Sequence, residues 1–535
     1  MSLQASVFYT ALLVSLVYWR WRSYKRRRGL PLPPGPKGWP IIGNVYDIPH
    51  DHAWLTYAQW GKTFGDIIYM DVFGTETIVL NSLQAAIELL EKRSANYTDR
   101  PDMIMANDLM EWGWDFAHMR HSEWWRRHRK TFHQYFQPRA ITSFQPVQEA
   151  ATFTLLNQFL DSPSRFAAHV RQHSGSVVLK LVYGYDVKAE DDYYVALADE
   201  AIHGLGQAVH AGSFYVDFLP ILRHVPAWVP GAGFQLQAKI WAKSSHALRD
   251  TPFNVVKKEI SQGIAIPSFV TENLEKMDSS DNVQEGQEEI IKNCAGISYL
   301  AGSDTTVSVI LTWILAMMHN PAIQAKAYAE LESIVGNSRF PCFDDRSKLP
   351  YLEAVLSETL RWNPVTPLGS LNFYGVYIPF ADQYRTALPH RAIAEDVYEG
   401  YYIPAGATVT PNTWAIFHDE ALYPEPFKFK PERFLPEDSK HMPPDPAVSG
   451  AFGFGRRICP GRHLAVNSAW IAIASILSTF EIRKPVDATG KEVDIPIEYT
   501  DGLVSHPVPF HPRLLPRSQA AVNLIRAAKD DSFAA

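Results

Sequence analysis

A cysteine set among glycines and arginines is the feature of this sequence with the clearest chemical meaning. Cys459 lies in residues 452–461, which read FGFGRRICPG. Glycines let a backbone approach a flat ligand closely, and arginines offer fixed positive charges to its carboxylates. Cations and nearby backbone N–H groups also favour the thiolate form of cysteine. The stretch therefore predicts a ligand-binding loop around Cys459, whereas Cys294 and Cys342 fit small buried hydrophobic residues.

The loop resembles the heme-binding loop of cytochrome P450 monooxygenases, whose pattern is F-x-x-G-x-R-x-C-x-G. Its fixed positions are occupied by Phe452, Gly455, Arg457, Cys459 and Gly461. The resemblance implies that the cofactor is heme b (iron protoporphyrin IX) and that the Cys459 thiolate is the axial ligand of its iron. It also implies that Phe452 helps to hold the heme and that Arg457 bonds a heme propionate.

A polar cluster, AGSDTT at residues 301–306, interrupts a long apolar stretch. Glycine weakens a helix and threonine can bond back to a carbonyl, so the cluster could be an ordinary polar patch. It resembles the family's oxygen-activation motif, in which small residues leave room for dioxygen. By that resemblance Asp304 and Thr305 are the catalytic residues that organise protons and water, and Thr306 is a second hydroxyl.

Two further matches occur in the family's order along the chain. Glu358 and Arg361 precede Arg433, and the resemblance implies that the three form a buried ion network that supports the heme loop. Burying one of these charges without its partners is costly, so the trio should fail together. Trp125 and Arg129 fit the family's W-x-x-x-R motif, in which both side chains contact heme propionates.

The family's pattern is broken in front of His390. Members normally pass within a few residues from a segment like residues 362–368 to a Pro-His or Pro-Arg pair beside a propionate, so His390 is the expected contact. Here residues 369–387 intervene, a connection that is long and unusually aromatic for a solvent loop. Two interpretations remain open, a real surface loop and a translated intron. An insert at this place could displace His390 and disable the pocket.

The elements that must position these residues are mainly helical. Residues 288–319 are apolar on most faces until Asn320-Pro321 and predict a helix that crosses the centre of the protein. Further helices are predicted at 321–335 and 351–362, and strands at 67–72 and 77–80. The sequence thus predicts a mainly α fold with a minor β region, which the resemblance identifies as the cytochrome P450 fold. We expect one domain at residues 38–517, followed by a C-terminal tail at 518–535.

The N-terminal residues predict a membrane anchor. Residues 1–19 carry no charge, and six cations follow between residues 20 and 28. This order fits an uncleaved span with the cations in the cytoplasm, because a secretory signal carries its charge before the apolar core. We therefore expect an anchor at 1–21 and a basic, proline-rich hinge at 22–37. Together with the resemblance to microsomal members, this predicts a single pass in the endoplasmic reticulum membrane and a cytoplasmic catalytic domain.

Composition excludes several classes of protein. The 535 residues are 46% hydrophobic and 20% charged, which excludes global disorder and allows a large core. The net charge of −7 argues against a nucleic-acid partner, which requires a basic surface. Three cysteines cannot form a disulfide framework, so a reducing environment is expected.

The predicted function is a monooxygenase that inserts one atom of dioxygen into a lipophilic small molecule. By resemblance, electrons come from NADPH through a separate flavin-containing NADPH–cytochrome P450 reductase, with cytochrome b5 as a second candidate donor, and the basic residues around Trp125 face the acidic partner. Residues 414–420 resemble fungal members of secondary metabolism, such as the O-methylsterigmatocystin oxidoreductase group; xenobiotic oxidation is the other setting considered.

Two alternatives to the monooxygenase remain open. One is a heme-thiolate isomerase or dehydratase that needs no reductase, and the other is a heme protein whose catalysis is impaired by the insert.

For the substrate cavity we expect an apolar wall. Its members are Met103, Met105, Leu109, Met110, Trp114 and Phe116. The resemblance implies further substrate contacts from parts of 204–218, the helix around Tyr299 and Leu300, the stretch after Pro364, and Leu503-Val504.

Overall fold

The structure is a computed structural model that describes residues 27, 29–49, 51–188, 191–208, 214–279, 284–368, 388–436 and 442–532. The predicted anchor at 1–21, part of the hinge, and the insert at 369–387 lie outside the described residues.

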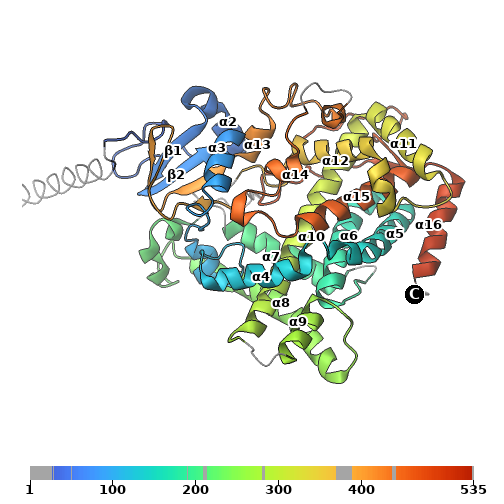
Figure 1. Ribbon diagram of the computed structural model, residues 1–535, viewed down its shortest axis with the longest axis horizontal. Coiled ribbons are helices and arrows are strands. Elements are labelled where there is room, and N and C mark those ends of the chain that lie inside the picture. Colours follow the sequence, from blue (N-terminus) through green and yellow to red (C-terminus); the bar gives the residue numbers. More distant parts are fainter. Residues whose placement is uncertain are drawn as a thin grey trace, which may run out of the picture.

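Helices make up most of the described chain, as the sequence predicts (Figure 1). The α-helices are α2 (Ala53–Phe64), α3 (Leu83–Ala86), α4 (Glu123–Phe136), α5 (Gln145–Asp161), α6 (Phe166–Tyr183), α7 (Tyr193–Ala208), α8 (Phe234–Gln262), α9 (Phe269–Asp278), α10 (Gln287–His319), α11 (Pro321–Val335), α12 (Pro350–Trp362), α13 (Thr413–Phe417), α14 (Pro446–Ser449), α15 (Arg462–Thr479) and α16 (Gln519–Ser532). Short π-helical turns are η1 (Ile87–Lys92) and η2 (Ile104–Leu109). Short 3₁₀ turns are η3 (Ile141–Phe144), η4 (Pro163–Arg165), η5 (Tyr215–Asp217), η6 (Pro220–His224), η7 (Phe343–Lys348), η8 (Pro431–Phe434) and η9 (Gly455–Arg457).

The β part consists of small sheets. The strands are β1 (Ile67–Val72), β2 (Thr75–Leu80), β3 (His390–Arg391), β4 (Asp396–Tyr398), β5 (Tyr401–Ile403), β6 (Thr408–Pro411), β7 (Phe480–Arg483) and β8 (Arg513–Pro516). The largest sheet has the order β1-β2-β6-β3, in which β2 pairs in parallel with β6 and the other pairs are antiparallel. It therefore joins chain segments that lie more than 300 residues apart, because Thr77 pairs with Thr408.

The long helix α10 runs through the centre of the protein and packs against α4, α6, α7, α8, α9, α12 and α15 (Figure 1). Its apolar side chains point in every direction because neighbours surround it, which confirms the expectation of a central helix. Among the described residues, α10 is also the helix whose length and hydropathy would suffice to cross a membrane, and it is buried inside the protein.

The two ends of the described chain pack onto the globule. In the proline-rich segment expected to act as a hinge, the carbonyl of Pro31 accepts a hydrogen bond from Tyr402 N (2.8 Å) and that of Pro34 from Tyr69 N (2.9 Å). At the other end, the residues expected to form a tail contain α16, which packs on α5. There the Asn157 side chain donates to the carbonyl of Ile525 (2.9 Å).

Candidate active site

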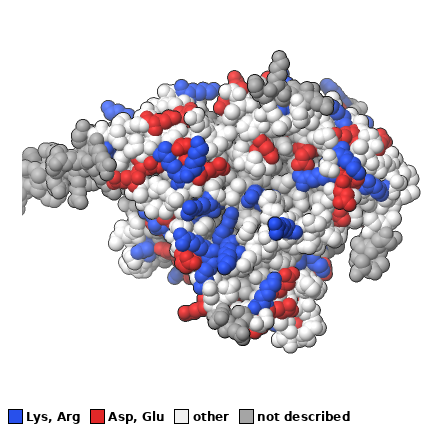
Figure 2. Space-filling view, viewed as in Figure 1, with Lys and Arg blue, Asp and Glu red and all other residues white. Residues whose placement is uncertain are grey.

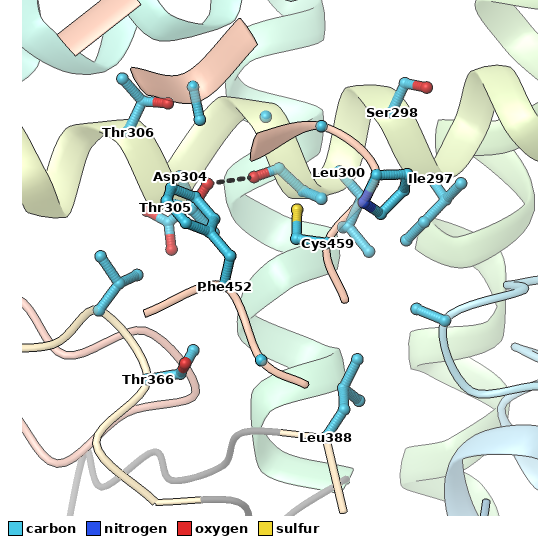
Figure 3. Close-up of a pocket in the computed structure, with 18 of the residues that line it drawn as sticks. Ile297, Ser298, Leu300, Asp304, Thr305, Thr306, Thr366, Leu388, Phe452 and Cys459 are labelled. Atoms are coloured by element: carbon cyan, nitrogen blue, oxygen red, sulfur yellow. Dashed lines mark hydrogen bonds between the residues drawn. The ribbon is translucent and has the colours of Figure 1, made fainter. Parts of the chain in front are cut away.

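A central cavity of about 370 Å³ lies between α10, α4, α15 and the loop that contains Cys459. Figure 3 shows part of it, with α10 passing along one side. Every site residue predicted from the sequence lines this cavity. These residues are Trp125, Arg129, Asp304, Thr305, His390, Phe452, Arg457 and Cys459. Side chains separated by more than 300 residues in the chain are thus brought together.

The cysteine loop has a conformation that depends on its glycines. The backbone N–H of Cys459 donates to the Phe452 carbonyl at 2.9 Å, and this bond closes the loop. Gly455 has φ +58°, and a Cβ at this position would collide with the carbonyl of Leu90. Gly453 has φ +76°, and a Cβ there would meet open space. The loop therefore presents bare backbone to the cavity, with the sulfur of Cys459 pointing into it (Figure 3).

The cations and backbone N–H groups near Cys459 favour its thiolate, as expected, but burial acts in the opposite direction. Burial raises the pKa of the Cys459 thiol, and the backbone N–H of Gly461 and the guanidinium groups of Arg129 and Arg462 only partly offset that rise. The cost of burying an anion exceeds the stabilisation that these groups provide. The protein alone therefore favours the thiol form, and a metal ion bound to this sulfur would stabilise the thiolate.

Arg457 links the cysteine loop to residues 98–119 on the neighbouring wall of the cavity. Its guanidinium donates to the carbonyl groups of Thr98 (2.6 Å), Phe116 (3.3 Å) and Met119 (2.8 Å). It also lies over the ring of Trp125, with 4.0 Å between Cζ and the ring centroid. Burial, together with a neighbouring arginine, lowers the pKa of Arg457 to about 8. Three of its five N–H groups have acceptors within the described part of the chain, and the other two can serve a ligand.

Trp125 and Arg129 reach the cavity from α4. The helix begins at a Ser122 cap whose hydroxyl accepts from Trp125 N (3.1 Å), and this cap fixes the first turn. Arg129 lies one turn further along and donates through one Nη2 to the carbonyl of Ile458 at 2.5 Å, next to the cysteine. The spacing of four residues therefore places both side chains on the same face, toward the cysteine loop.

His390 lies in β3 and lines the cavity despite the insert in front of it. Its Nδ1 is 2.7 Å from the Tyr97 carbonyl, which can only accept, so Nδ1 carries the proton of the neutral ring. Burial, followed by the charge of Arg100, lowers the pKa of His390 to about 3. Arg100 in turn donates to the carbonyl groups of Leu388 (2.9 Å) and Pro389 (2.7 Å), which ties the residues just before His390 to the cavity wall.

The charges in this region suit an anionic ligand. Arg100 and Arg457 are both buried: burial first, and then the charge of Arg129, lowers the pKa of Arg100 to about 10, and Arg100 in turn helps to lower the pKa of Arg457. Asp115, a carboxylate in the same wall, is already engaged, because its Oδ2 lies 2.5 Å from His118 Nδ1. Buried cations without counter-charge are unfavourable. A flat ligand with two carboxylates, lying against the backbone at Gly453 with a metal at Cys459, would satisfy this arrangement, and heme has these properties.

In the polar cluster of α10, Thr305 bonds back to its own helix, whereas Asp304 forms ion pairs with other elements. The Thr305 hydroxyl donates to the carbonyl of Ala301 at 2.9 Å, within the helix (Figure 3). The Asp304 carboxylate accepts from Arg171 Nη1 at 2.8 Å and lies 3.1 Å from His506 Nε2. Burial by itself would raise the pKa of Asp304, but His506 and Arg171 outweigh it and hold this pKa at about 2. Asp304 on α10 is therefore ionised at neutral pH, and it is held by Arg171 on α6 and by His506.

Arg171 extends this network toward the surface. The same Nη1 that contacts Asp304 also donates to Asp199 Oδ1 on α7 at 3.0 Å. The Asp199 side chain is 43% exposed, whereas that of Asp304 is 8% exposed. A line of charged side chains therefore leads from the wall of the cavity to solvent.

The expected ion network under the heme loop is confirmed. The Glu358 carboxylate accepts from Arg361 Nε (2.7 Å) and Nη2 (2.9 Å) and lies 3.2 Å from Arg433 Nε. The side chains of Glu358 and Arg361 are completely buried. Arg361 also donates to the carbonyl groups of Phe417 and Pro426, so the trio fastens α12 to the chain that leads to the cysteine loop.

Sequence reasoning also missed residues and assigned others wrongly. Arg100, Arg171 and His506 were not anticipated, because no local spacing marks a lone basic residue that meets its partner across the fold. Of the six side chains expected to form the substrate wall, Phe116 lines the cavity. The other five lie away from it; Trp114, for example, donates to Ser245 on α8. The other expected segments do reach the cavity, with Leu205, Leu300, Val365, Leu503 and Val504, whereas Val178 on α6 and Ile202 on α7 complete the aliphatic wall without having been expected.

Comparison with known proteins agrees with this geometry. The family model described as cytochrome P450 matches residues 33–371 and 379–512. Cytochrome P450 monooxygenase 208 of Postia placenta is 41% identical over 517 residues, which are 96% of each chain. Tryptamine 4-monooxygenase of Psilocybe cyanescens is 41% identical over 522 residues, covering 95% of this chain and 98% of that protein. A zebra fish cytochrome P450 structure with abiraterone superposes with a TM-score of 0.66 at 22% identity, covering 87% of this chain and 100% of that one.

The chain therefore belongs to the cytochrome P450 family, and the protein is a cytochrome P450 monooxygenase. Membership of this family implies a heme-thiolate cofactor, which the residues of the central cavity fit. The mainly helical fold with minor sheets, predicted from the sequence, is that of the family.

Proposed function

We propose that the protein oxidises a lipophilic, uncharged small molecule in fungal secondary metabolism, with electrons delivered by a separate NADPH-dependent reductase. The observation that carries this proposal is the convergence of Cys459, its cationic surroundings and the Asp304–Thr305 pair on one cavity. The fungal relatives at about 40% identity support the setting. Xenobiotic oxidation would use the same chemistry and differ only in the substrate.

Each site residue has a proposed role toward the heme. Cys459 binds the iron through its sulfur, Phe452 packs at the same loop, and Trp125, Arg129, His390 and Arg457 hold the propionates. The bound heme supplies the activation of dioxygen, which the protein alone cannot carry out. His390 must take up a proton at Nε2 to donate to a carboxylate, and the negative charge of a propionate favours that uptake because it offsets the nearby cations.

The remaining site residues manage protons. Asp304 remains ionised, so we assign it to orienting donors rather than to donating a proton from its own carboxyl group. A water at its carboxylate would be replenished through the charged line of Arg171 and Asp199. The Thr305 hydroxyl must turn from the Ala301 carbonyl to donate toward the cavity, where it would hold a proton next to bound dioxygen.

The proposed substrate class follows from the aliphatic and aromatic residues that line the central cavity. Phe116, Ile202, Leu205 and Ile297 make the wall apolar. Among the described lining residues, the carboxylates are Asp115 and Asp304, and both already have cationic or imidazole partners. A protonated amine would therefore find no free counter-ion here and would lose its hydration. This supports an uncharged substrate, even though one relative is named for its action on tryptamine.

A basic surface supports the proposed reductase. Figure 2 shows Lys and Arg gathered in the middle of the face that contains α4. Arg126, Lys130 and Arg456 are exposed there, close in sequence to the residues that face the heme. Such a surface attracts an acidic partner and accelerates its encounter. NADPH–cytochrome P450 reductase and cytochrome b5 are the proposed partners, and the flavin belongs to the reductase.

The proposed location is the endoplasmic reticulum membrane, with an anchor at residues 1–21, a hinge at 22–37 and the catalytic domain in the cytoplasm. Exposed apolar side chains support membrane contact. Trp39 and Ile41 follow the hinge, and Ile221 and Trp228 lie on a proline-rich segment. The two segments approach each other, because Val45 and Phe218 pack against the same small cluster of Ile48 and Val72. Such side chains are suited to the interfacial region of a bilayer.

A reduced, carbon-monoxide-bound absorption spectrum tests the heme assignment. The parent protein should show the red-shifted Soret band of thiolate ligation, and Cys459→Ser should lose it. Cys342→Ser is the matched control, because Cys342 lies outside the cavity and should leave the band unchanged. A parent without this band, or a Cys459→Ser protein that retains it, would overturn the assignment.

Turnover separates the monooxygenase from the remaining alternatives. With reductase present, NADPH oxidation and incorporation of ¹⁸O from dioxygen into a lipophilic product are expected. Product formation without NADPH would favour the isomerase or dehydratase. A normal heme spectrum without any turnover would favour the impaired protein, provided that deletion of residues 369–387 restores turnover. The family model leaves residues 372–378 unmatched within this insert, which makes the deletion worthwhile.

A further inference from the structure

A second cavity, of about 220 Å³, lies between the C-terminal end of α6, the start of α7, and α8. These helices cluster beside α10 in Figure 1. None of the residues that line this second cavity also lines the central one. It is therefore a separate feature of the protein, which the chemistry at Cys459 leaves unexplained.

Two residues with unusual backbone properties lie in the wall of the second cavity. Pro252 lies inside α8 and lines the cavity, and a proline has no N–H to donate to the carbonyl four residues earlier. Gly184 ends α6 at φ +73°, and a Cβ there would come within 2.9 Å of Ile266 on the opposite wall. Gly184 thus allows the end of α6 to approach Ile266 closely, and Pro252 leaves one carbonyl of α8 without its usual helical donor.

Aromatic rings form much of its wall. The rings of Tyr185 and Tyr194 stand nearly perpendicular, at 82°, with 4.8 Å between their centroids. Tyr183 adds a third ring. Its hydroxyl is buried and has no hydrogen-bond partner among the described residues. An oxygen of this kind carries a partial negative charge that no described donor neutralises, which favours a cation nearby.

The charge of this cavity is negative. Asp186 and Glu259 belong to its described lining, which contains no lysine or arginine. The Asp186 carboxylate forms an ion pair with Lys180 Nζ at 2.7 Å on the surface. Glu259, by contrast, forms no ion pair with any described residue. The pKa of Tyr194 is raised by burial first, and then by its neighbours, Glu259 among them. An aromatic corner beside an unpaired carboxylate is the arrangement that binds organic cations.

We propose that the second cavity binds a small organic cation, an ammonium group with apolar substituents. The ammonium group would lie against the faces of Tyr185 and Tyr194, near the carboxylate of Glu259. Its apolar substituents would contact Val256 and Ile266 in the same wall. This cavity thus offers the counter-ion that the central cavity lacks.

The second cavity and the central cavity share neighbouring residues of α6, although no residue lines both. Helix α6 contributes Leu181 and Val182 to the central cavity and Tyr183 to the second one. The Tyr183 ring also contacts Tyr299 on α10, with 6.1 Å between centroids, and its neighbour Leu300 lines the central cavity. A cation bound in the second cavity should therefore change the affinity for compounds in the central cavity, and the reverse change must be equal in size.

Equilibrium dialysis of the holoprotein with benzyltrimethylammonium tests this proposal. The probe carries a permanent charge and has no lone pair with which to bind iron. Its uncharged carbon isostere, neopentylbenzene, is the matched ligand control. We expect saturable binding of one cation per protein, at least about tenfold tighter than binding of the isostere. A saturating lipophilic imidazole, which fills the central cavity, should shift the Kd without displacing the cation.

Two variants locate the site. Glu259→Gln should weaken binding of benzyltrimethylammonium about tenfold. Glu275→Gln makes the same charge change at an exposed position outside the cavity and should leave the Kd unchanged. The proposal is overturned if the cation does not bind, binds no better than its isostere, is displaced competitively by the imidazole, or binds equally to both variants. None of these outcomes bears on the heme assignment, which the carbon-monoxide spectrum tests separately.

Discussion

Replacement of Glu358 by glutamine should destabilise the protein far more than the same change at Glu353, although both residues lie on α12. Glu358 balances two buried guanidinium groups, those of Arg361 and Arg433, and also accepts from Lys430 N at 2.7 Å. Glutamine keeps the shape of the side chain but removes its charge, so both cations lose their counter-ion. Breaking such a buried pair costs about 3–5 kcal/mol, a large share of the roughly 5–15 kcal/mol that stabilises a typical domain.

Glu353 provides the control within the same helix. It pairs with Arg346 at 2.6 Å, but the two side chains are 42% and 24% exposed. An exposed pair of this kind contributes only about 0–1 kcal/mol. Glu353→Gln should therefore unfold at nearly the urea concentration of the parent, whereas Glu358→Gln should unfold at a much lower one.

Urea unfolding followed by circular dichroism measures this difference, and the carbon-monoxide spectrum reports the fraction that retains thiolate-bound heme. Both signals should fall in Glu358→Gln, because the trio fastens α12 to the segment before the cysteine loop. A triple variant with leucine at Glu358, Arg361 and Arg433 should recover part of the stability, since it leaves no unpaired charge. Equal stability of the two single variants, within about 1 kcal/mol, would refute the assignment of a buried, interdependent trio.

Three further predictions follow from the cavity walls. Because His506 and Arg171 hold the pKa of Asp304 at about 2, below its ordinary 3.8, its ionisation stabilises the fold above pH 3.8, and that contribution is lost as the pH falls through about 2. Asp304→Asn should therefore lack about 2 kcal/mol of the acid-dependent loss seen in the parent, measured by urea unfolding at stepped pH; identical pH profiles would contradict this. Thr305→Ala should keep the thiolate spectrum but consume NADPH while releasing peroxide, measured against product formed, and unchanged coupling of NADPH to product would disprove the proposed proton role. Gly455→Ala should lower heme content strongly, because a Cβ would collide with the Leu90 carbonyl at a positive φ, whereas Gly490→Ala, at φ +84° in open space, is the control for backbone strain alone.

The sequence predicted the site where its chemistry is local, and failed where partners meet only in the fold. The spacing around Cys459 and the four-residue step from Trp125 to Arg129 lie within one loop and one helix turn, so a motif describes them. Arg171 and His506 meet Asp304 from different elements, and neither carries a local signal. The consequence is that the carboxylate is tied into an ion network, which no pattern of residues 301–306 reveals.

The fold shows the same division. The central helix was predicted within one residue of its ends, because a long run of apolar residues and a terminating Asn-Pro define it. The partner of β2 was not predicted, since parallel pairing with β6 depends on contacts across more than 300 residues. The direction of the Cys459 pKa also escaped the sequence, because burial is a property of the whole fold and here outweighs the adjacent cations. Val178 on α6 and Ile202 on α7 were missed in the cavity wall for the same reason.

The order of strands in the largest sheet bears on how the protein is made. On the ribosome, β1 and β2 emerge early and can pair as a hairpin, yet the neighbour that covers the open edge of β2 is translated more than 300 residues later. During that interval the nascent chain presents an unsatisfied strand edge, a template for aggregation. The cysteine loop emerges later still. Heme capture is thus confined to the last stage of synthesis, and expression at reduced temperature with chaperones should raise the yield of pigmented protein.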